Sequence, residues 1–157
     1  MELHALPLTY RATIKAEYLD HMGHMNVMWY THLFDQATWA FFAQVGMDKA
    51  YFEEHSAGCA ALEQHTHYLA ELRHGANVSL RSRALGRSPK RLHFMHFMVN
   101  EDAGVLAATT EIIGIHIDRG ARRSSPLPAS IAATIDRLLA EHQALNWDAP
   151  VCGLMEP

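Results

Sequence analysis

Residues 20–45, DHMGHMNVMWYTHLFDQATWAFFAQV, decide the fold of this chain. From residue 27 onward, apolar side chains recur at helical spacing, which predicts a helix over Val27–Val45. Asn26 stands where a helix N-cap belongs, and Gly46 stands where a C′ residue belongs. The apolar stripe consists of Tyr30, Leu33, Phe34, Ala37, Phe41 and Val45. Because this stripe is rich in aromatic side chains, we expect the helix to be largely buried.

On both sides of this helix the apolar residues alternate as they do in β-strands. A first strand is expected over 9–19, ahead of the loop at 20–26. Four more are expected near 58–72, 76–87, 91–101 and 104–118, separated by turn signals at His74-Gly75, Ser88-Pro89 and residues 101–104. This spacing predicts successive antiparallel hairpins.

After a loop at 119–130, the sequence pattern predicts one more helix, with Ser130 as its cap. Its apolar face consists of Ile131, Ile135, Leu138 and Leu139. One sheet wrapped around one buried helix is an α+β architecture. We therefore expect a single domain over 1–157, with its core at about 9–118 and a C-terminal loop and helix at 119–145.

The second face of the expected sheet is also apolar. The segments HFMHFMV (93–99) and VLAATTEIIGI (105–115) carry more apolar side chains than one helix can cover. A single chain has little left with which to bury them, so we expect a homodimer or a homotetramer.

Composition excludes several functional classes. With 157 residues, 49% hydrophobic and 19% charged, the chain has the make-up of a globular domain rather than a disordered segment. A net charge of −4 argues against nucleic-acid binding. The apolar runs are too short for a membrane span, and no signal peptide is visible. Two cysteines, Cys59 and Cys152, form neither a disulfide framework nor a metal motif, which favours a reducing, cytoplasmic location.

The loop at 20–26 carries the most chemical information. Asp20 is a carboxylate placed shortly before a helix whose first N–H groups lack partners. A carbonyl oxygen held at those N–H groups would be stabilised as it becomes an oxyanion, and Asp20 could act on the same carbonyl as base or nucleophile. Gly23 lets the backbone pass close to a ligand. Alternatively, Asp20 and Asn26 only complete a turn and cap the helix.

The segment EYLDHMGHMNVMWYTHLFDQATWAFFAQVG (17–46) resembles hotdog-fold acyl-CoA thioesterases of the 4-hydroxybenzoyl-CoA thioesterase type. It has the Asp-x-x-Gly-His-x-Asn loop, a tyrosine four residues after the asparagine, and Phe-Asp-x-Ala on the helix. The segments HYLAELRHG (67–75), KRLHFMHFM (90–98), AATTEIIGIHID (107–118) and RRSSPLP (122–128) extend the similarity, and the longer set resembles the betainyl-CoA thioesterase branch. The similarity covers most of residues 10–145.

The resemblance implies a hotdog fold, which is a five-stranded antiparallel sheet around the central helix, and dimers with active sites at the subunit interface. It implies that Asp20 is the catalytic carboxylate and that a backbone N–H at Val27 or its neighbour binds the oxyanion. His24 and Asn26 match the loop and are expected to orient the thioester or to support the loop. Gly23 and Tyr30 are expected to contact the substrate.

A second thioesterase branch places its carboxylate on the central helix. Asp35 is the only carboxylate between residues 27 and 45, and it lies off the apolar stripe. We therefore favour Asp20 as the catalyst and expect Asp35 to be structural.

Basic residues gather at two turns. Arg87, Lys90 and Arg91 flank Ser88-Pro89, and three more arginines lie in the 119–130 loop. Arginine and lysine bind phosphates well, so the first group is the candidate site for the coenzyme A phosphates. The alternative is a solvated basic surface.

The twelve histidines form no metal motif. His65 and His67 share a strand face and could bind one ion, but we expect no metal and no redox cofactor. Glu63 and Glu111 are expected to be structural. Two rival functions stay open: a hotdog enoyl-CoA hydratase that uses Asp20 with His24, and a non-catalytic module that binds an acyl ligand.

Overall fold

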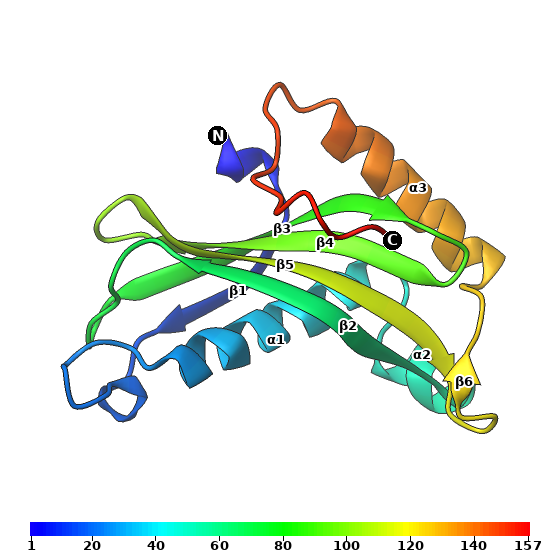
Figure 1. Ribbon diagram of the computed structural model, residues 1–157, viewed down its shortest axis with the longest axis horizontal. Helices are drawn as coiled ribbons and strands as arrows, with labels where there is room; N and C mark the ends of the chain where they lie inside the picture. Colours follow the sequence, from blue (N-terminus) through cyan, green and yellow to red (C-terminus); the bar gives the residue numbers. More distant parts are fainter.

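The computed structural model describes residues 1–157, and it confirms the α+β architecture (Figure 1). Five strands form an antiparallel sheet in the order β1-β3-β4-β5-β2, and a two-residue strand, β6, pairs with β5. The long helix α1 lies along one face of the curled sheet, and α3 lies on the opposite side. The strands are β1 (Leu8–Thr13), β2 (Ala57–Tyr68), β3 (Asn77–Arg87), β4 (Arg91–Asn100), β5 (Val105–Asp118) and β6 (Arg123–Ser124), and the helices are α1 (Val27–Gln44), α2 (Lys49–Glu54) and α3 (Ala129–Gln143).

Helix α1 forms where the periodicity predicts it. Its apolar stripe faces the sheet, and Leu33, Ala37 and Phe41 are fully buried. The stripe divides between two clusters of buried side chains, one around Phe41 and Phe42 and one around Tyr30 and Leu33. Burial of this face against the sheet fixes the direction and position of the helix axis.

Strand pairing confirms part of the hairpin prediction. β3 with β4 and β4 with β5 are antiparallel hairpins. The predicted hairpin of β2 with β3 is wrong, because β2 pairs with β5 and β3 pairs with β1. The turn at His74-Gly75 therefore belongs to a crossing connection, in which Gly75 adopts φ +85°. A turn signal marks where a strand ends, but it does not identify the strand's partner.

Three element boundaries differ from expectation. The first strand ends at Thr13, and a 3-10 helix at Ala16–Tyr18 turns the chain toward α1. The stretch after α1 contains α2, whose first turn is capped by the Asp48 side chain. Helix α3 begins at Ala129 with Pro128 at the cap position, so Ser130 does not cap it.

The chain covers the second face of its own sheet, contrary to expectation. Leu6, Met95 and Phe97 form a buried cluster under Trp147 and Ala149 of the C-terminal segment. Figure 1 shows this segment and α3 lying on that side. Strand β4 is buried along most of its length as a result.

The exposed part of the sheet is instead the edge strand β2. It is 12 residues long, and most of its side chains are exposed, including Leu62 and Tyr68. A long edge strand presents a row of unpaired backbone groups, and another strand can pair with them.

No helix of the structure has the length and apolar character needed to cross a membrane.

At the β1 edge of the sheet, a buried histidine of α3 accepts a hydrogen bond from a backbone N–H of β3 that no strand pairs with. β1 pairs only as far as Arg81, and the Ser82 N–H donates to the carbonyl of Pro7 just before β1. The following N–H on that side of β3, that of Ala84, has no strand partner. Nδ1 of His142 on α3 accepts a hydrogen bond from it at 2.9 Å. Burial, together with the nearby charge of Arg83, lowers the pKa of His142 to about 4. The ring is therefore neutral in the folded protein at pH 7, as this bond requires.

This arrangement predicts that the replacement His142→Asn reduces the acid sensitivity of folding. The folded state keeps His142 neutral between pH 6.5 and about 4, whereas the unfolded chain binds a proton, so the free energy of unfolding falls as pH falls. An asparagine oxygen can accept the same bond and does not titrate. Between pH 7 and pH 4.5, urea unfolding should show the parent losing roughly 2 kcal/mol more stability than the variant. Equal losses would contradict the role given to His142.

Candidate active site

The loop before α1 is a closed turn held by its own backbone. Leu19 and Met25 form an isolated β-bridge, and the Asp20 N–H donates to the His24 carbonyl at 2.9 Å. Gly23 adopts φ +85°, a conformation in which a side chain would be strained. The loop is anchored to the body of the protein because Met25 N–H donates to the Leu72 carbonyl. Asp20 is thereby fixed beside the start of α1.

The N-terminus of α1 is only partly capped. The Asn26 side chain accepts a hydrogen bond from the Met28 N–H at 3.0 Å, which confirms Asn26 as the N-cap. No hydrogen bond within the protein engages the Val27 N–H. This free donor lies at the positive end of the helix dipole, and it can stabilise a negative oxygen.

Asp20 keeps one carboxylate oxygen free. Its Oδ1 accepts the Met22 N–H at 2.8 Å, so the turn role considered from sequence is real. The second oxygen makes no hydrogen bond within the protein and remains able to accept a proton or attack a carbonyl. Turn formation and catalysis therefore do not exclude each other here.

A pocket of about 450 Å³ brings five of the predicted site residues together. They are Asp20, His24, Asn26, Val27 and Tyr30, whereas Gly23 shapes the loop without lining the pocket. The opposite wall is the segment that leaves β2, and none of its residues is predicted from sequence to belong to the site. It consists of Tyr68, Leu69, Ala70 and Glu71. The family-like segment HYLAELRHG contains all four, and that match was the only signal that could have identified them.

Two side chains tie the loop and α1 to this wall. Nε2 of His24 lies 3.4 Å from a carboxylate oxygen of Glu71. The Tyr30 hydroxyl donates to the Ala70 carbonyl at 3.4 Å, and burial raises the pKa of Tyr30. The phenol therefore stays protonated and serves as a neutral donor.

The basic turn lies at the other end of the sheet. Tyr68 of the pocket wall pairs with Ala108 of β5, whereas Arg91 pairs with Ile115. Seven residues of strand separate these positions, which is about 23 Å. Within one chain, the structure therefore does not bring Arg87, Lys90 and Arg91 to the Asp20 pocket.

The three basic residues differ in their availability. Arg87 makes two hydrogen bonds of 2.6 Å to Asp136, and this pairing raises its pKa. Lys90 contacts only the Ser124 hydroxyl, at 3.2 Å, and the exposed Arg91 side chain forms no ion pair. Lys90 and Arg91 are therefore freer than Arg87 to meet an anion.

The acidic and histidine candidates outside the loop have structural partners or lie on the surface. Glu111 is buried, and hydrogen bonds from Cys152 N–H and His93 outweigh the effect of burial and hold its pKa below the usual range. Glu63 is exposed on β2.

The prediction that His65 and His67 share a strand face is confirmed, since their Nε2 atoms are 2.9 Å apart. No group of three or more His, Cys, Asp and Glu side chains is arranged to hold a metal ion.

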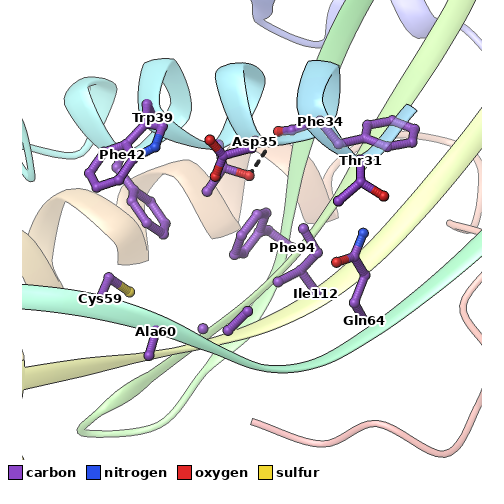
Figure 2. Close-up of a pocket in the computed structure, with 13 residues that line it drawn as sticks. Thr31, Phe34, Asp35, Trp39, Phe42, Cys59, Ala60, Gln64, Phe94 and Ile112 are labelled. Atoms are coloured by element: carbon purple, nitrogen blue, oxygen red, sulfur yellow. Dashed lines mark hydrogen bonds between the residues drawn. The ribbon is translucent and has the colours of Figure 1, made fainter. Parts of the chain in front are cut away.

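A second, smaller pocket opens between α1 and β2, next along the helix (Figure 2). Its volume is about 140 Å³. Asp35, which is expected from its sequence position to be structural, lines this pocket. Cys59 also lines it, and burial raises the pKa of that thiol to about 12, so the group is not a nucleophile at neutral pH.

Comparison with known proteins gives a consistent result. Residues 14–135 match the model of the thioesterase-like superfamily. The chain is 31% identical over 137 residues to the betainyl-CoA thioesterase of Pseudomonas aeruginosa, covering 87% of this chain and 86% of that protein. It is 32% identical to the L-carnitine dehydrogenase/betainyl-CoA thioesterase of Agrobacterium fabrum, covering 85% of this chain and 27% of that longer protein.

Among solved structures, the Staphylococcus aureus protein SAV2348, determined in complex with CoA, superposes with a TM-score of 0.83. It is 28% identical, and the match covers 91% of this chain and 90% of that one. The fold of the present chain is therefore the hotdog fold of this group of thioesterases.

Proposed function

The chain belongs to the thioesterase-like superfamily, and we propose that it is an acyl-CoA thioesterase that uses Asp20 and the N-terminus of α1 to hydrolyse its substrate. The observation that carries this proposal is that one pocket is lined both by Asp20, which has a free carboxylate oxygen, and by Val27, which has an unpaired N–H at the start of α1. A thioester carbonyl needs both groups, one to stabilise its oxygen and one to act on its carbon.

The proposed reaction proceeds in two stages. The thioester oxygen accepts the Val27 N–H, and the free oxygen of Asp20 takes a proton from water as that water attacks the carbonyl carbon. The tetrahedral intermediate then breaks its C–S bond, and the proton returns to the departing thiolate to give free CoA. Direct attack by Asp20 would produce the same products through an acyl-enzyme. Neither route uses a metal or a redox cofactor.

His24 and Asn26 have supporting roles in this proposal. Asn26 caps α1 and so keeps the helix start rigid, and His24 joins the loop to Glu71 on the opposite wall. Its ring nitrogen Nε2 faces Glu71, which supports hydrolysis over an enoyl-CoA hydratase that uses Asp20 and His24 as a pair.

We propose that two copies pair through the edge strand β2. Antiparallel pairing about a two-fold axis joins two copies of the same strand, so the Tyr68 end of one strand lies beside the Ala57 end of the other. The basic turn lies at the Ala57 end, since Ala57 pairs with Asp118 and Arg91 pairs with Ile115. The turn of one copy then approaches the Asp20 pocket of the other, where Lys90 and Arg91 can bind CoA phosphates.

The relatives indicate the acyl group. The two proteins from Pseudomonas aeruginosa and Agrobacterium fabrum are named as betainyl-CoA thioesterases, so we propose betainyl-CoA, or a similarly small cationic acyl-CoA, as the substrate.

The first prediction from this proposed function is that Asp20→Asn lowers kcat roughly 10²-fold or more, since the amide cannot accept the proton. The fold should survive, because the amide oxygen can still accept the Met22 N–H. Release of free thiol from acyl-CoA gives the rate, and Glu17→Gln, an exposed acid nearby, is the matched control. Near-parental activity of a folded Asp20→Asn protein would remove Asp20 from the reaction.

A second prediction concerns assembly. Sedimentation at micromolar concentration should give the mass of a dimer or a tetramer, because the β2 edge is long and exposed. A monomeric mass would exclude the shared site.

The third prediction is that replacing both Lys90 and Arg91 with alanine raises KM for acyl-CoA far more than it lowers kcat. The phosphates lie far from the breaking bond, so these contacts are alike in bound substrate and transition state. The effect should shrink at high salt and vanish for a truncated thioester without the nucleotide. Unchanged KM at low salt would mean that these two side chains are only surface charge.

A further inference from the structure

The chemistry of betainyl-CoA restricts where its cation can bind. In a betainyl thioester, the quaternary nitrogen lies two bonds, about 2.5 Å, from the carbonyl carbon. With the carbonyl oxygen held by the Val27 N–H, this nitrogen is no more than about 7 Å from that donor. The Asp20 pocket, which Val27 lines, must then bind the cation as well as the reacting carbonyl.

The charge of the Asp20 pocket suits a cation. Two carboxylates line the pocket, those of Asp20 and Glu71, and no lysine or arginine does. Glu71 has two basic neighbours, His24 and Arg73, each at 3.4 Å. Arg73 is largely exposed, and a long ion pair between exposed side chains is weak. These contacts therefore leave the Glu71 carboxylate able to attract a further cation.

Tyr68 gives the same pocket an open aromatic ring. Its ring centre lies 5.1 Å from that of Tyr30, and the interplanar angle of 82° shows that the two rings pack edge to face. Tyr30 is buried, and its hydroxyl donates to the Ala70 carbonyl, whereas Tyr68 remains 50% exposed. The Tyr68 ring is therefore supported on one side and still offers surface to a ligand.

An aromatic surface suits a trimethylammonium group in particular. A quaternary nitrogen has no N–H and cannot donate a hydrogen bond, and proteins bind such groups on the faces of aromatic rings. In the proposed dimer, the Ala57 end of the second copy's β2 lies beside Tyr68 and excludes water from it. Cation–π attraction is stronger where water is excluded, so assembly would strengthen this contact.

We propose that the Tyr68 ring and the Glu71 carboxylate bind the trimethylammonium group of the acyl moiety and so select a cationic thioester. The two residues lie in the same wall of the Asp20 pocket, opposite the loop and the start of α1. This assignment rests on the proposed thioesterase function and deepens it, because it names the residues that determine the acyl group. Tyr30 then positions Tyr68, and Asp20 acts on the carbonyl.

The test compares two CoA esters of nearly equal shape. Betainyl-CoA carries a trimethylammonium group, and 3,3-dimethylbutyryl-CoA carries a neutral tert-butyl group in its place. The measured quantity is the ratio of kcat/KM for the cationic ester to kcat/KM for the neutral ester, after subtraction of the enzyme-free rates. The parent should give a ratio of about ten or more. Because the cationic ester is also the more electrophilic, the decisive quantity is the change in this ratio between parent and variant.

Two variants should lower the ratio, and two matched controls should not. Tyr68→Leu and Glu71→Gln should each lower it about fivefold or more, since one removes the ring and the other removes the charge. Glutamine keeps the shape of Glu71, and the ratio cancels any loss that affects both esters alike. Tyr68→Phe keeps the aromatic face and should stay within about twofold of the parent. Glu63→Gln, which changes an exposed acid of β2 outside the pocket, should leave the ratio unchanged.

The outcomes separate this inference from the proposed function. An unchanged ratio in Tyr68→Leu or in Glu71→Gln would overturn the assignment, while hydrolysis itself would still stand. If the parent cleaves neither ester, the thioesterase function fails for these substrates, and calorimetry still tests the pocket. Betainyl-CoA should then bind the parent more tightly than the neutral ester, and both variants should reduce that difference. Equal binding of the two esters by the parent would overturn the assignment.

Discussion

Burial of α1 in the curl of the sheet is the constraint on which the rest of the molecule depends. The apolar stripe leaves the helix one face to bury, and the sheet provides one concave surface on which to bury it. Once the axis is fixed, the N-terminus of α1 lies beside the segment that leaves β2, and Val27 lines a pocket with that segment. The proposed reaction site and the second pocket, which Asp35 lines, both depend on this placement, because residues of α1 form part of each.

The features that sequence could predict are those determined by short-range pattern. The period of residues 27–45 located α1 to within one residue, and Asn26 marked its cap. The loop 20–26 and its position before the helix predicted that Asp20 lies beside the helix start. The family resemblance added His24 and Tyr30, and all three line one pocket. Loop spacing also identified the β3–β4 and β4–β5 hairpins.

The features that sequence could not predict are those that depend on contacts between distant segments. Nothing local to β2 shows that it crosses over to pair with β5, and this pairing decides which strand forms the exposed edge. The C-terminal segment covers the outer face because Trp147 and Arg83 pack together and Cys152 N–H bonds to Glu111, contacts between residues far apart in the chain. Asp35 looked structural because it lies off the apolar stripe, yet that same displacement turns it toward β2 and into a pocket.

The central claim is that this chain hydrolyses a thioester, and it is tested most directly by supplying one purified preparation with an acyl-CoA and, separately, with an enoyl-CoA. Quantifying free CoA, carboxylate and hydrated product in both reactions separates hydrolysis from hydration and from mere binding. The account predicts one free thiol and one carboxylate for each acyl-CoA consumed, with no hydration of the double bond and no loss of rate after treatment with a metal chelator. Hydrated enoyl-CoA with an intact thioester, or bound acyl-CoA that is never cleaved, would contradict it.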